Sequence, residues 1–258
     1  REYFYTLLVP ADAHGLFPCF DQPALRARFR LEVDVPPEWT AVANAEPTEA
    51  DDPLFPAAPA GRLWRFAPTK PLPTYLFAFA AGPFAEFTPA HPIVPGITTD
   101  APMRILLRES KLEHLDRGAI IKLHHEGLAW LAETFDVPYP FDKLDLVLLP
   151  GFPYGGMEHA GAIFYRETSL VFDHPPTVAE QVRRSTLVYH ELSHQWFGNL
   201  VTMKWFDDLW LKEGFATFFG YRAMAELEPK QRAWLRFLQR VKPRAYSVDA
   251  TAGTTPIF

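Results

Sequence analysis

The sequence predicts an α+β protein in which a β-rich first third precedes a part that mixes strands with long helices. Three observations support this prediction: strand-like alternation in the first third, helical periodicity in residues 111–135, and three further helical patterns towards the end. The chain has 258 residues, 48% apolar and 22% charged, which is enough to bury a substantial core. Its 26 prolines favour turns and edge strands over a helical bundle.

The first third alternates short apolar runs with turn residues. Residues 25–35 carry apolar side chains at every second position and mostly charged side chains between them, which is typical of a strand. Residues 62–66 and 74–81 predict two further strands, and proline clusters at 53–59 and 68–73 separate them. This arrangement predicts a sandwich or an open sheet.

Composition changes at residues 82–96, where prolines and glycines predict a connector. We therefore expect two domains, residues 1–84 and residues 85–258. Within the second domain, strands and helices follow one another. The expected strands are 103–107, 144–149 and 162–172. The expected helices are 111–135, 177–198, 207–227 and 230–242.

Charge and composition argue against several classes of protein. The formal net charge of −6 argues against a nucleic-acid-binding surface, so we expect no nucleic acid partner. The longest apolar stretch, residues 72–83, is too short and too broken by proline to be a transmembrane segment. No signal peptide is visible, and the first residues resemble the middle of a strand, so we expect a truncated N-terminus and leave the compartment open.

The sharpest motif is His190-Glu191-Leu192-Ser193-His194, inside a helical pattern. Histidines four positions apart lie about 40° apart around a helix, so both imidazoles face one point and can bind Zn²⁺. Glu191 projects beside them, where a carboxylate can accept a proton from a water that the metal activates. The alternative is a helix that carries two histidines on one face by chance, and a third ligand would argue against it.

Glu213 offers that third ligand, 19 positions after His194 and within the next predicted helix. Two histidines and a glutamate leave one position open, as in catalytic zinc sites, whereas structural zinc sites are usually closed by four protein ligands. We therefore predict one zinc ion per chain, bound by His190, His194 and Glu213. Glu126 and Asp208 are the next candidates for the third ligand.

These residues resemble the gluzincin clan of zinc peptidases, and the flanking segments 195–203 and 207–210 are similar to the aminopeptidase N family in particular. A second segment, Gly155-Gly156-Met157-Glu158-His159, resembles the family's Gly-x-Met-Glu-Asn strand. By itself this pattern is more typical of a turn beside a surface glutamate. In the family the strand lines the substrate cleft, and its glutamate holds the free α-amino group of the substrate.

The resemblance therefore implies that Gly155, Gly156, Met157 and Glu158 bind substrate. A carboxylate can pair with an ammonium group, and glycines let a peptide backbone approach closely.

The same resemblance implies a thermolysin-like catalytic domain at residues 85–258, preceded by part of a β-sandwich or saddle domain at residues 1–84. It implies a zinc-dependent aminopeptidase that hydrolyses the N-terminal bond of peptides with a free N-terminus, with Glu191 as general base. One alternative is a zinc endopeptidase or a leukotriene-hydrolase-like enzyme. Another is a non-catalytic binding module on the same fold, although such a module would be expected to lose its metal ligands.

The sequence departs from the family pattern at several points. Val9 stands where the family usually has a second acidic residue for the amine, and His159 replaces an asparagine. The family's oxyanion-stabilising tyrosine would fall beyond Phe258, and Tyr246 comes too early for that role. The family's C-terminal helical domain is also absent from this chain. We therefore expect the truncated chain to bind zinc and to be a weak or inactive catalyst.

Other conspicuous side chains have structural interpretations. His124 and His125 are adjacent and therefore point to different faces of a helix. Asp207 and Asp208 precede a predicted helix, where capping is the expected role. The apolar side of residues 230–242 is expected to pack against the catalytic domain, with a membrane surface as the alternative.

Overall fold

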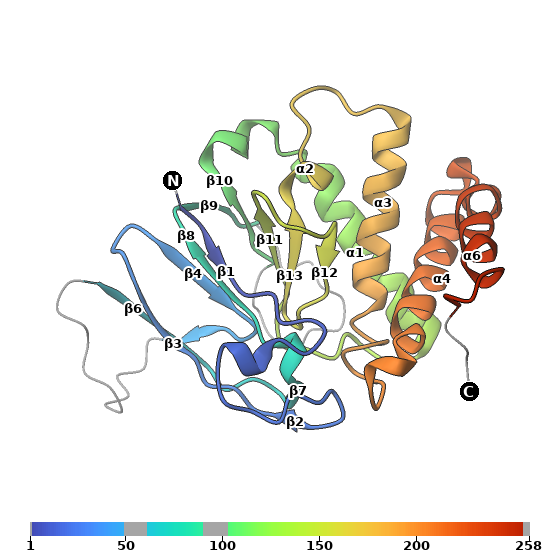
Figure 1. Cartoon of the computed structure of the whole chain (residues 1–258). Coiled ribbons are helices and arrows are strands. Elements are labelled where there is room, and N and C mark those ends of the chain that lie inside the picture. Colours follow the sequence, from blue (N-terminus) through green and yellow to red (C-terminus); the bar gives the residue numbers. More distant parts are fainter. Residues whose placement is uncertain (1, 49–60, 90–102, 255–258) are drawn as a thin grey trace.

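The computed structural model describes residues 2–48, 61–89 and 103–254. Small sheets of the N-terminal part lie on one side of a central sheet, and long helices lie on the other (Figure 1). The structure is therefore of mixed helix and sheet, as predicted. The proline cluster at 53–59 and the later part of the expected connector, residues 90–96, lie outside the described residues.

The described N-terminal strands form three small antiparallel sheets. One sheet has the order β1 (Phe4–Tyr5), β8 (Phe79–Gly82), β4 (Thr40–Ala43). Another has the order β3 (Glu32–Val35), β6 (Arg62–Phe66), β5 (Pro47–Thr48). In the third, β2 (Arg26–Ala27) pairs with β7 (Leu72–Pro73), and a short 3₁₀ helix, η1 (Ala13–Gly15), lies between β1 and β2 in the sequence.

Two strand predictions in this part were wrong in extent. The strand expected at 25–35 is interrupted, because Phe29 bonds Thr69 through one backbone and one side-chain hydrogen bond instead of a regular ladder. The strand expected at 74–81 starts only at Phe79. Before it, η2 (Thr74–Leu76) is a 3₁₀ turn that the bond from Phe77 N to Thr74 O closes.

The central sheet has five strands among the described residues. Its order is β12 (Gly156–Met157), β13 (Ala162–Arg166), β11 (Asp145–Leu149), β10 (Ile105–Arg108), β9 (Phe84–Phe87). Strands β10, β11 and β13 are parallel, and the two edge strands are antiparallel to their neighbours.

Two further expectations are corrected in this sheet. Strand β9 lies inside the expected connector, because its backbone pairs with β10 from Phe84 to Phe87. The strand expected at 162–172 ends at Arg166. There Arg108 holds the buried carboxylate of Glu167 at 2.9 Å, and the short helix α2 (Glu167–Leu170) begins. The domain boundary at 84/85 stays a prediction, and it would cut β9 after its first residue.

Long helices cover one face of the central sheet. They are α1 (Arg117–Phe135), α3 (Val178–Ser193) and α4 (Trp210–Leu227). The helix expected at 111–135 is broken, since η3 (Glu109–His114) is a 3₁₀ helix and Asp116 caps α1 by accepting a bond from Ala119 N.

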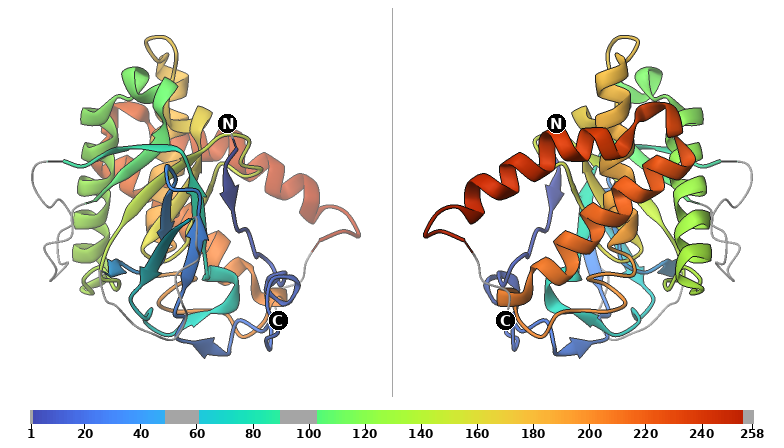
Figure 2. Two further views of the ribbon diagram at one scale, coloured as in Figure 1. Left: turned by 90° about the vertical axis from the view of Figure 1, so that its left-hand side faces the viewer. Right: turned by 90° about the vertical axis from the view of Figure 1, so that its right-hand side faces the viewer.

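The end of the described chain remains helical further than predicted. Four short elements follow α4: η5 (Pro229–Gln231), α5 (Ala233–Arg236), the π-helical turn η6 (Phe237–Val241) and α6 (Lys242–Asp249). Ring contacts of Trp234 with Phe218 and of Phe237 with Tyr221 pack this end against α4, which agrees with the expected packing. Helix α6 projects from the body of the molecule (Figure 2).

None of the helices in the described ranges has both the length and the apolar character that crossing a bilayer requires.

The central strands alternate between two cores. Leu146 and Leu148 face the helices, whereas Val147 and Leu149 face the N-terminal sheets. Both faces are buried, which explains why 145–149 reads as a continuous apolar run after its first residue. The second core is shared by the two parts of the chain, so the N-terminal strands help to hold the sheet that carries the candidate site.

Candidate metal centre

Helix α3 carries the two histidines of the motif, and its first turn is fixed by a capping box. The Thr177 hydroxyl accepts from Glu180 N, and the Glu180 carboxylate accepts from Thr177 N at 2.8 Å. At the other end, His194 keeps helical backbone angles as the C-cap and donates its N–H to His190 O. Both imidazoles therefore lie on one face of the last turn.

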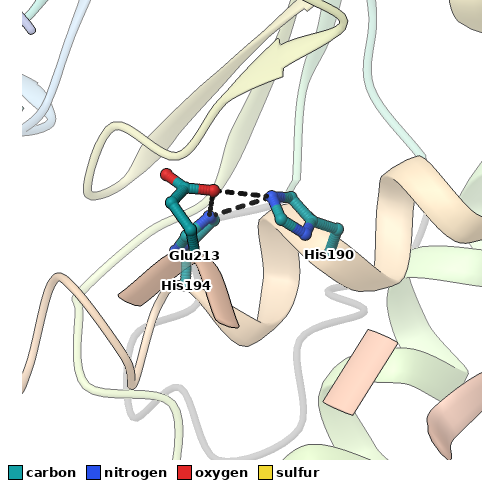
Figure 3. Close-up of side chains that lie close together, drawn as sticks. All are labelled: His190, His194 and Glu213. Atoms are coloured by element: carbon teal, nitrogen blue, oxygen red, sulfur yellow. Dashed lines mark hydrogen bonds and ion pairs between the residues drawn. The ribbon is translucent and has the colours of Figure 1, made fainter. Parts of the chain in front are cut away.

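Helix α4 packs beside α3 and brings Glu213 to these imidazoles (Figure 3). The two Nε2 atoms of His190 and His194 are 3.0 Å apart. Glu213 Oε2 lies 3.5 Å from each of them. The structure thus brings together the three residues that the sequence predicted as a ligand set.

These three atoms fit a zinc ion. Ligands at about 2.0–2.1 Å around a tetrahedral metal lie about 3.3 Å from one another. The observed separations of 3.0, 3.5 and 3.5 Å match that value. A second group of side chains within metal-binding distance of one another, Glu158, Glu191 and His194, shares His194 with this set. The donor set is therefore chemically and geometrically suited to one metal ion with an open position.

The second nitrogen of His194 is also fixed. Its Nδ1 lies 3.0 Å from the carbonyl oxygen of Phe197, which can only accept, so Nδ1 carries the proton. In the neutral ring, Nε2 then keeps its lone pair and points towards His190 and Glu213. An outer hydrogen bond of this kind orients a histidine for metal binding.

Glu191 is 4% exposed and lies next to the histidine pair. The pKa of Glu191 is raised to about 8, chiefly by burial; the carboxylates of Glu158 and Glu213 also raise it, whereas His190 and Lys212 lower it. A carboxyl with such a pKa is suited to exchanging a proton near neutral pH.

Glu158 is held from two directions. Its backbone carbonyl accepts from Asn199 Nδ2 at 2.7 Å and from Gln195 Nε2 at 3.1 Å, in the loop after α3. Its buried carboxylate pairs with Lys212, whose Nζ is also 3.0 Å from Glu213 Oε1. Burial alone would raise the pKa of Glu158, but His194 and Lys212 outweigh it and hold that pKa at about 2.

Gly156, the first residue of β12, makes room for Glu191. A Cβ at Gly156 would lie 2.5 Å from Glu191 Oε1, whereas one at Gly155 would lie 3.1 Å from the end of the Leu187 side chain. The Gly156 backbone is therefore in close contact with the candidate base. Met157 is buried beside it and pairs with Phe164 of β13.

A cavity of about 470 Å³ joins these groups. Every predicted site residue lines it, namely Gly155, Gly156, Met157, Glu158, His190, Glu191, His194 and Glu213. Val9 also lines it, at the position where the sequence resemblance leads one to expect an acid.

His159, the other departure from the pattern, is not in that wall. It is fully buried, and the centroid of its ring lies 4.5 Å from that of the Phe164 ring. Neither ring nitrogen has a hydrogen-bond partner among the described residues. Burial lowers the pKa of His159 to about 3, so the ring is neutral at physiological pH.

Two residues of the site were missed by sequence reasoning. Lys212 precedes Glu213 on a helix, so their side chains would be expected on different faces; here one lysine contacts both Glu158 and Glu213. Gly220 was also missed. A Cβ there would lie 3.1 Å from His190 N, so glycine permits the close approach of α4 to α3. The only signal for Gly220 was a small residue one helical repeat beyond Glu213.

Among the other side chains that the sequence singled out, one prediction is confirmed and one is wrong. His124 is structural: its Nδ1 lies 2.8 Å from Ile120 O and its Nε2 lies 3.0 Å from Tyr165 OH. Asp207 and Asp208 do not cap α4; they lie in the 3₁₀ turn η4 (Phe206–Asp208), and Leu209 is the cap residue.

The substitute ligand candidates are not part of the site. Glu126 pairs with Lys122 along α1. Neither Glu126 nor Asp208 joins the metal-compatible groups of the described residues. Tyr246 is exposed on α6 and does not line the cavity.

Comparisons with known proteins show which family the chain resembles. Residues 121–258 match the Peptidase family M1 domain, and residues 1–76 match the Peptidase M1 N-terminal domain. The chain is 36% identical over 260 residues to aminopeptidase N of Streptomyces lividans, covering 100% of the chain and 29% of that protein. It is 34% identical over 254 residues to a leucyl aminopeptidase of Saccharolobus solfataricus, covering 98% of the chain and 30% of that protein.

A plant relative gives the same result. Aminopeptidase M1-A of Oryza sativa subsp. japonica is 36% identical over 254 residues, which cover 98% of the chain and 27% of that protein. Together these matches define the class as metallopeptidases of the aminopeptidase type. The chain belongs to peptidase family M1. It spans less than a third of the length of the curated relatives named here.

Proposed function

We propose that this chain is the zinc-binding part of an aminopeptidase that hydrolyses the N-terminal bond of peptides with a free N-terminus. The observation that carries the proposal is the convergence of His190, His194 and Glu213 at 3.0–3.5 Å in the cavity that also holds Glu191 and Glu158. The relatives named aminopeptidase support the same activity.

His190, His194 and Glu213 would hold one zinc ion. When bound, zinc supplies Lewis acidity that lowers the pKa of a water and polarises the carbonyl of the bond to be cleaved. The protein supplies the orientation of both imidazoles, since Phe197 O fixes the His194 ring and α3 sets the spacing.

Glu191 is the general base in this proposal. It accepts a proton from the attacking water and then passes that proton to the nitrogen of the leaving peptide. Its burial and its raised pKa of about 8 match a group that must both accept and release a proton near neutral pH.

Glu158 anchors the substrate amine. Its carboxylate stays ionised because Lys212 and His194 hold its pKa at about 2, so it can pair with an ammonium group in the cavity. Gly155 and Gly156 leave the adjoining backbone of β12 open to an extended peptide. Anchoring the amine beside the metal restricts cleavage to the first bond.

Two measurements test the proposal. Metal analysis of the purified protein should give one zinc per chain, and Glu213→Ala should lower zinc affinity markedly because only two imidazoles remain. In a catalytically active form of the protein, free peptides should be cleaved and their N-acetylated counterparts should not. A chain without stoichiometric zinc would favour a non-catalytic binding module.

Val9 gives the second candidate its support. Because a valine lines the cavity where a second acid was expected, the amine has one carboxylate fewer to pair with. A zinc endopeptidase or a leukotriene-hydrolase-like enzyme needs no such pairing. Equal turnover of free and N-acetylated peptides would select this candidate.

The thermolysin-like character of the second domain and its start at residue 85 belong to the same proposal. The thermolysin-like character is supported by the mixed central sheet, which is covered on one face by α1, α3 and α4, whereas the start at residue 85 is a prediction only. Tyr246 does not line the cavity, whereas Tyr154 does.

A further inference from the structure

A larger cavity, of about 840 Å³, adjoins the metal site. Leu187 and His190 line both cavities, whereas Glu158 lines only the smaller one. A peptide whose amine is at Glu158 and whose first bond is at the metal can therefore continue past His190 into the larger cavity. The larger cavity is thus placed to receive the residues that follow the cleaved bond.

Four arginines line this larger cavity, against two acidic residues. The arginines are Arg166 next to α2, Arg183 of α3, Arg236 of α5 and Arg240 of η6. Arg236 and Arg240 are four positions apart in adjoining helical elements, and the fold brings Arg166 and Arg183 from earlier segments to the same cavity.

Both acidic residues are already engaged. Asp173 pairs with Lys111 at 2.5 Å. Glu180 accepts from the Thr177 backbone N–H at 2.8 Å and from its hydroxyl at 2.7 Å in the cap of α3. These contacts leave the arginines without a strong carboxylate partner, and the nearest contact, between Arg183 and Glu180, is 4.0 Å long.

Arg183 is the one arginine of the four with a carboxylate contact among the described residues, whereas Arg166 donates to the carbonyl oxygens of Phe152 and Pro153. Arg236 Nε donates to Gln231 O at 2.8 Å, which orients the guanidinium without cancelling its charge. Throughout residues 2–48, 61–89 and 103–254, neither arginine forms an ion pair with a carboxylate. Burial raises the pKa of Tyr221 in the cavity wall, and the charges of Arg240 and Arg236 oppose that rise, so both act on the cavity.

We propose that this cavity binds the part of a peptide that follows the cleaved bond, and that Arg236 and Arg240 make it select peptides with acidic residues there. The inference rests on the proposed function, which places the start of the peptide at Glu158. The chemical class of preferred substrate is therefore a peptide with a free amine and carboxylate side chains downstream of its first bond.

The test is binding of uncleavable peptides to the zinc-loaded protein, measured by calorimetry. Leu-Ala-Glu-Glu-Ala-amide, with a reduced first bond, is compared with the same peptide carrying Gln-Gln or Lys-Lys in place of Glu-Glu. We expect the acidic peptide to bind about 3- to 10-fold more tightly than the glutamine peptide, and the lysine peptide to bind most weakly. The preference should fall as salt is raised.

Variants assign that preference to the two arginines. In the double variant Arg236→Gln, Arg240→Gln, the affinities for the acidic and glutamine peptides should become equal within about twofold. The matched control is Arg244→Gln, which removes an exposed arginine of α6 that does not line the cavity and should leave the preference unchanged. Equal affinities in the wild-type protein, or a preference that survives the double variant, would overturn the inference.

A failure of the acidic preference can be distinguished from a failure of the proposed function. N-acetylated versions of the three peptides test the amine anchor, because acetylation should weaken all three by the same factor. The acidic preference is the ratio of the affinities for the acidic and the glutamine peptide. It can be measured separately among the free and among the N-acetylated peptides, whatever the effect of acetylation. A protein that binds zinc and none of the peptides contradicts the inference while leaving the metal site intact.

Discussion

Two buried lysines of this molecule pair with carboxylates in very different surroundings. Lys143 lies 2.6 Å from Asp145, and both side chains are 1% exposed. Arg104 adds two hydrogen bonds to Asp145, at 3.0 and 2.6 Å, and Gly161 O accepts from Lys143 at 2.9 Å. Lys143 lines a cavity of about 290 Å³, but both carboxylate oxygens of Asp145 are already bonded, Oδ1 by Arg104 and Oδ2 by Arg104 and Lys143.

Lys212 and Glu158 form the other pair, and they border an open cavity. Lys212 is shared with Glu213, and Glu213 is shared with His190 and His194. The two carboxylates of Glu158 and Glu213 therefore share the single ammonium group of Lys212. Burial therefore does not distinguish the two pairs. The second pair differs because these two carboxylates share one ammonium group in the wall of the candidate site, which marks these groups as candidates for function.

The largest effect is expected on turnover, from a change at Glu191 in the cavity that the second cluster borders. Glu191→Gln should lower turnover about 10²- to 10⁴-fold in a catalytically active form of the protein, because it removes the base. Zinc content should stay at the wild-type level, since no ligand is lost. Glu133→Gln, at an exposed position of α1, is the control and should change neither. Loss of zinc together with turnover would show that Glu191 is a ligand.

Next in size is a difference in stability between the clusters. Asp145→Asn should lower the free energy of unfolding by about 3–5 kcal/mol, because Lys143 and Arg104 lose a buried partner. Glu158→Gln should cost less, about 1–3 kcal/mol, because Lys212 keeps Glu213 at 3.0 Å. Urea unfolding of both variants measures the difference. Equal losses of unfolding free energy in the two variants would mean that Glu158 contributes as much to stability as Asp145.

A pair of glycine variants sharpens the comparison on the side of the metal site. Gly156→Ala should lower turnover about 10- to 100-fold, since its methyl group displaces the Glu191 carboxylate. Gly155→Ala should keep most of the activity, because only a flexible end of Leu187 must move. Circular dichroism and zinc content should be unchanged in both. A reversed order would contradict the contact of Glu191 with β12.

The smallest effect is expected on the pH dependence of the free energy of unfolding below about pH 5. Burial alone would raise the pKa of Asp145, but Lys143 and Arg104 outweigh it and hold that pKa below its ordinary value of 3.8. Asp145 therefore contributes stability above about pH 4, and the contribution is lost as the pH falls through that value towards the lower pKa of the folded state. Asp145→Asn should flatten this part of the profile in urea unfolding between about pH 5 and pH 3, and an unchanged slope would contradict the pairing.

Much of the site was predictable because its spacing is local. His190 and His194 are set by one helical turn, and that turn is independent of the rest of the fold. Glu213 was predictable from the two-helix arrangement together with the need for a third ligand. The strands were less predictable: β9 was mistaken for connector, because its pairing with β10 is decided by tertiary structure and not by its own pattern.

Lys212 and Gly220 could not be predicted for a related reason. The role of Lys212 exists only because Glu158, from a distant strand, meets α4 at the same point. Gly220 matters only because α4 approaches the backbone of His190 closely. Periodicity places a residue on a face of a helix, but it does not say which element comes to lie against that face.

The hydroxyl of Tyr75 donates to Gly198 O at 3.0 Å, and its ring lies 5.3 Å from Lys212 Nζ. Tyr75 also belongs to the core that Leu106, Val147 and Met157 share with the N-terminal sheets. The slowest-exchanging amides on both sides of the expected domain boundary should therefore exchange with a common opening free energy, as one foldon. We therefore expect the part that carries the candidate metal site not to fold independently, so that the two family domains matched along the sequence should unfold as one cooperative unit.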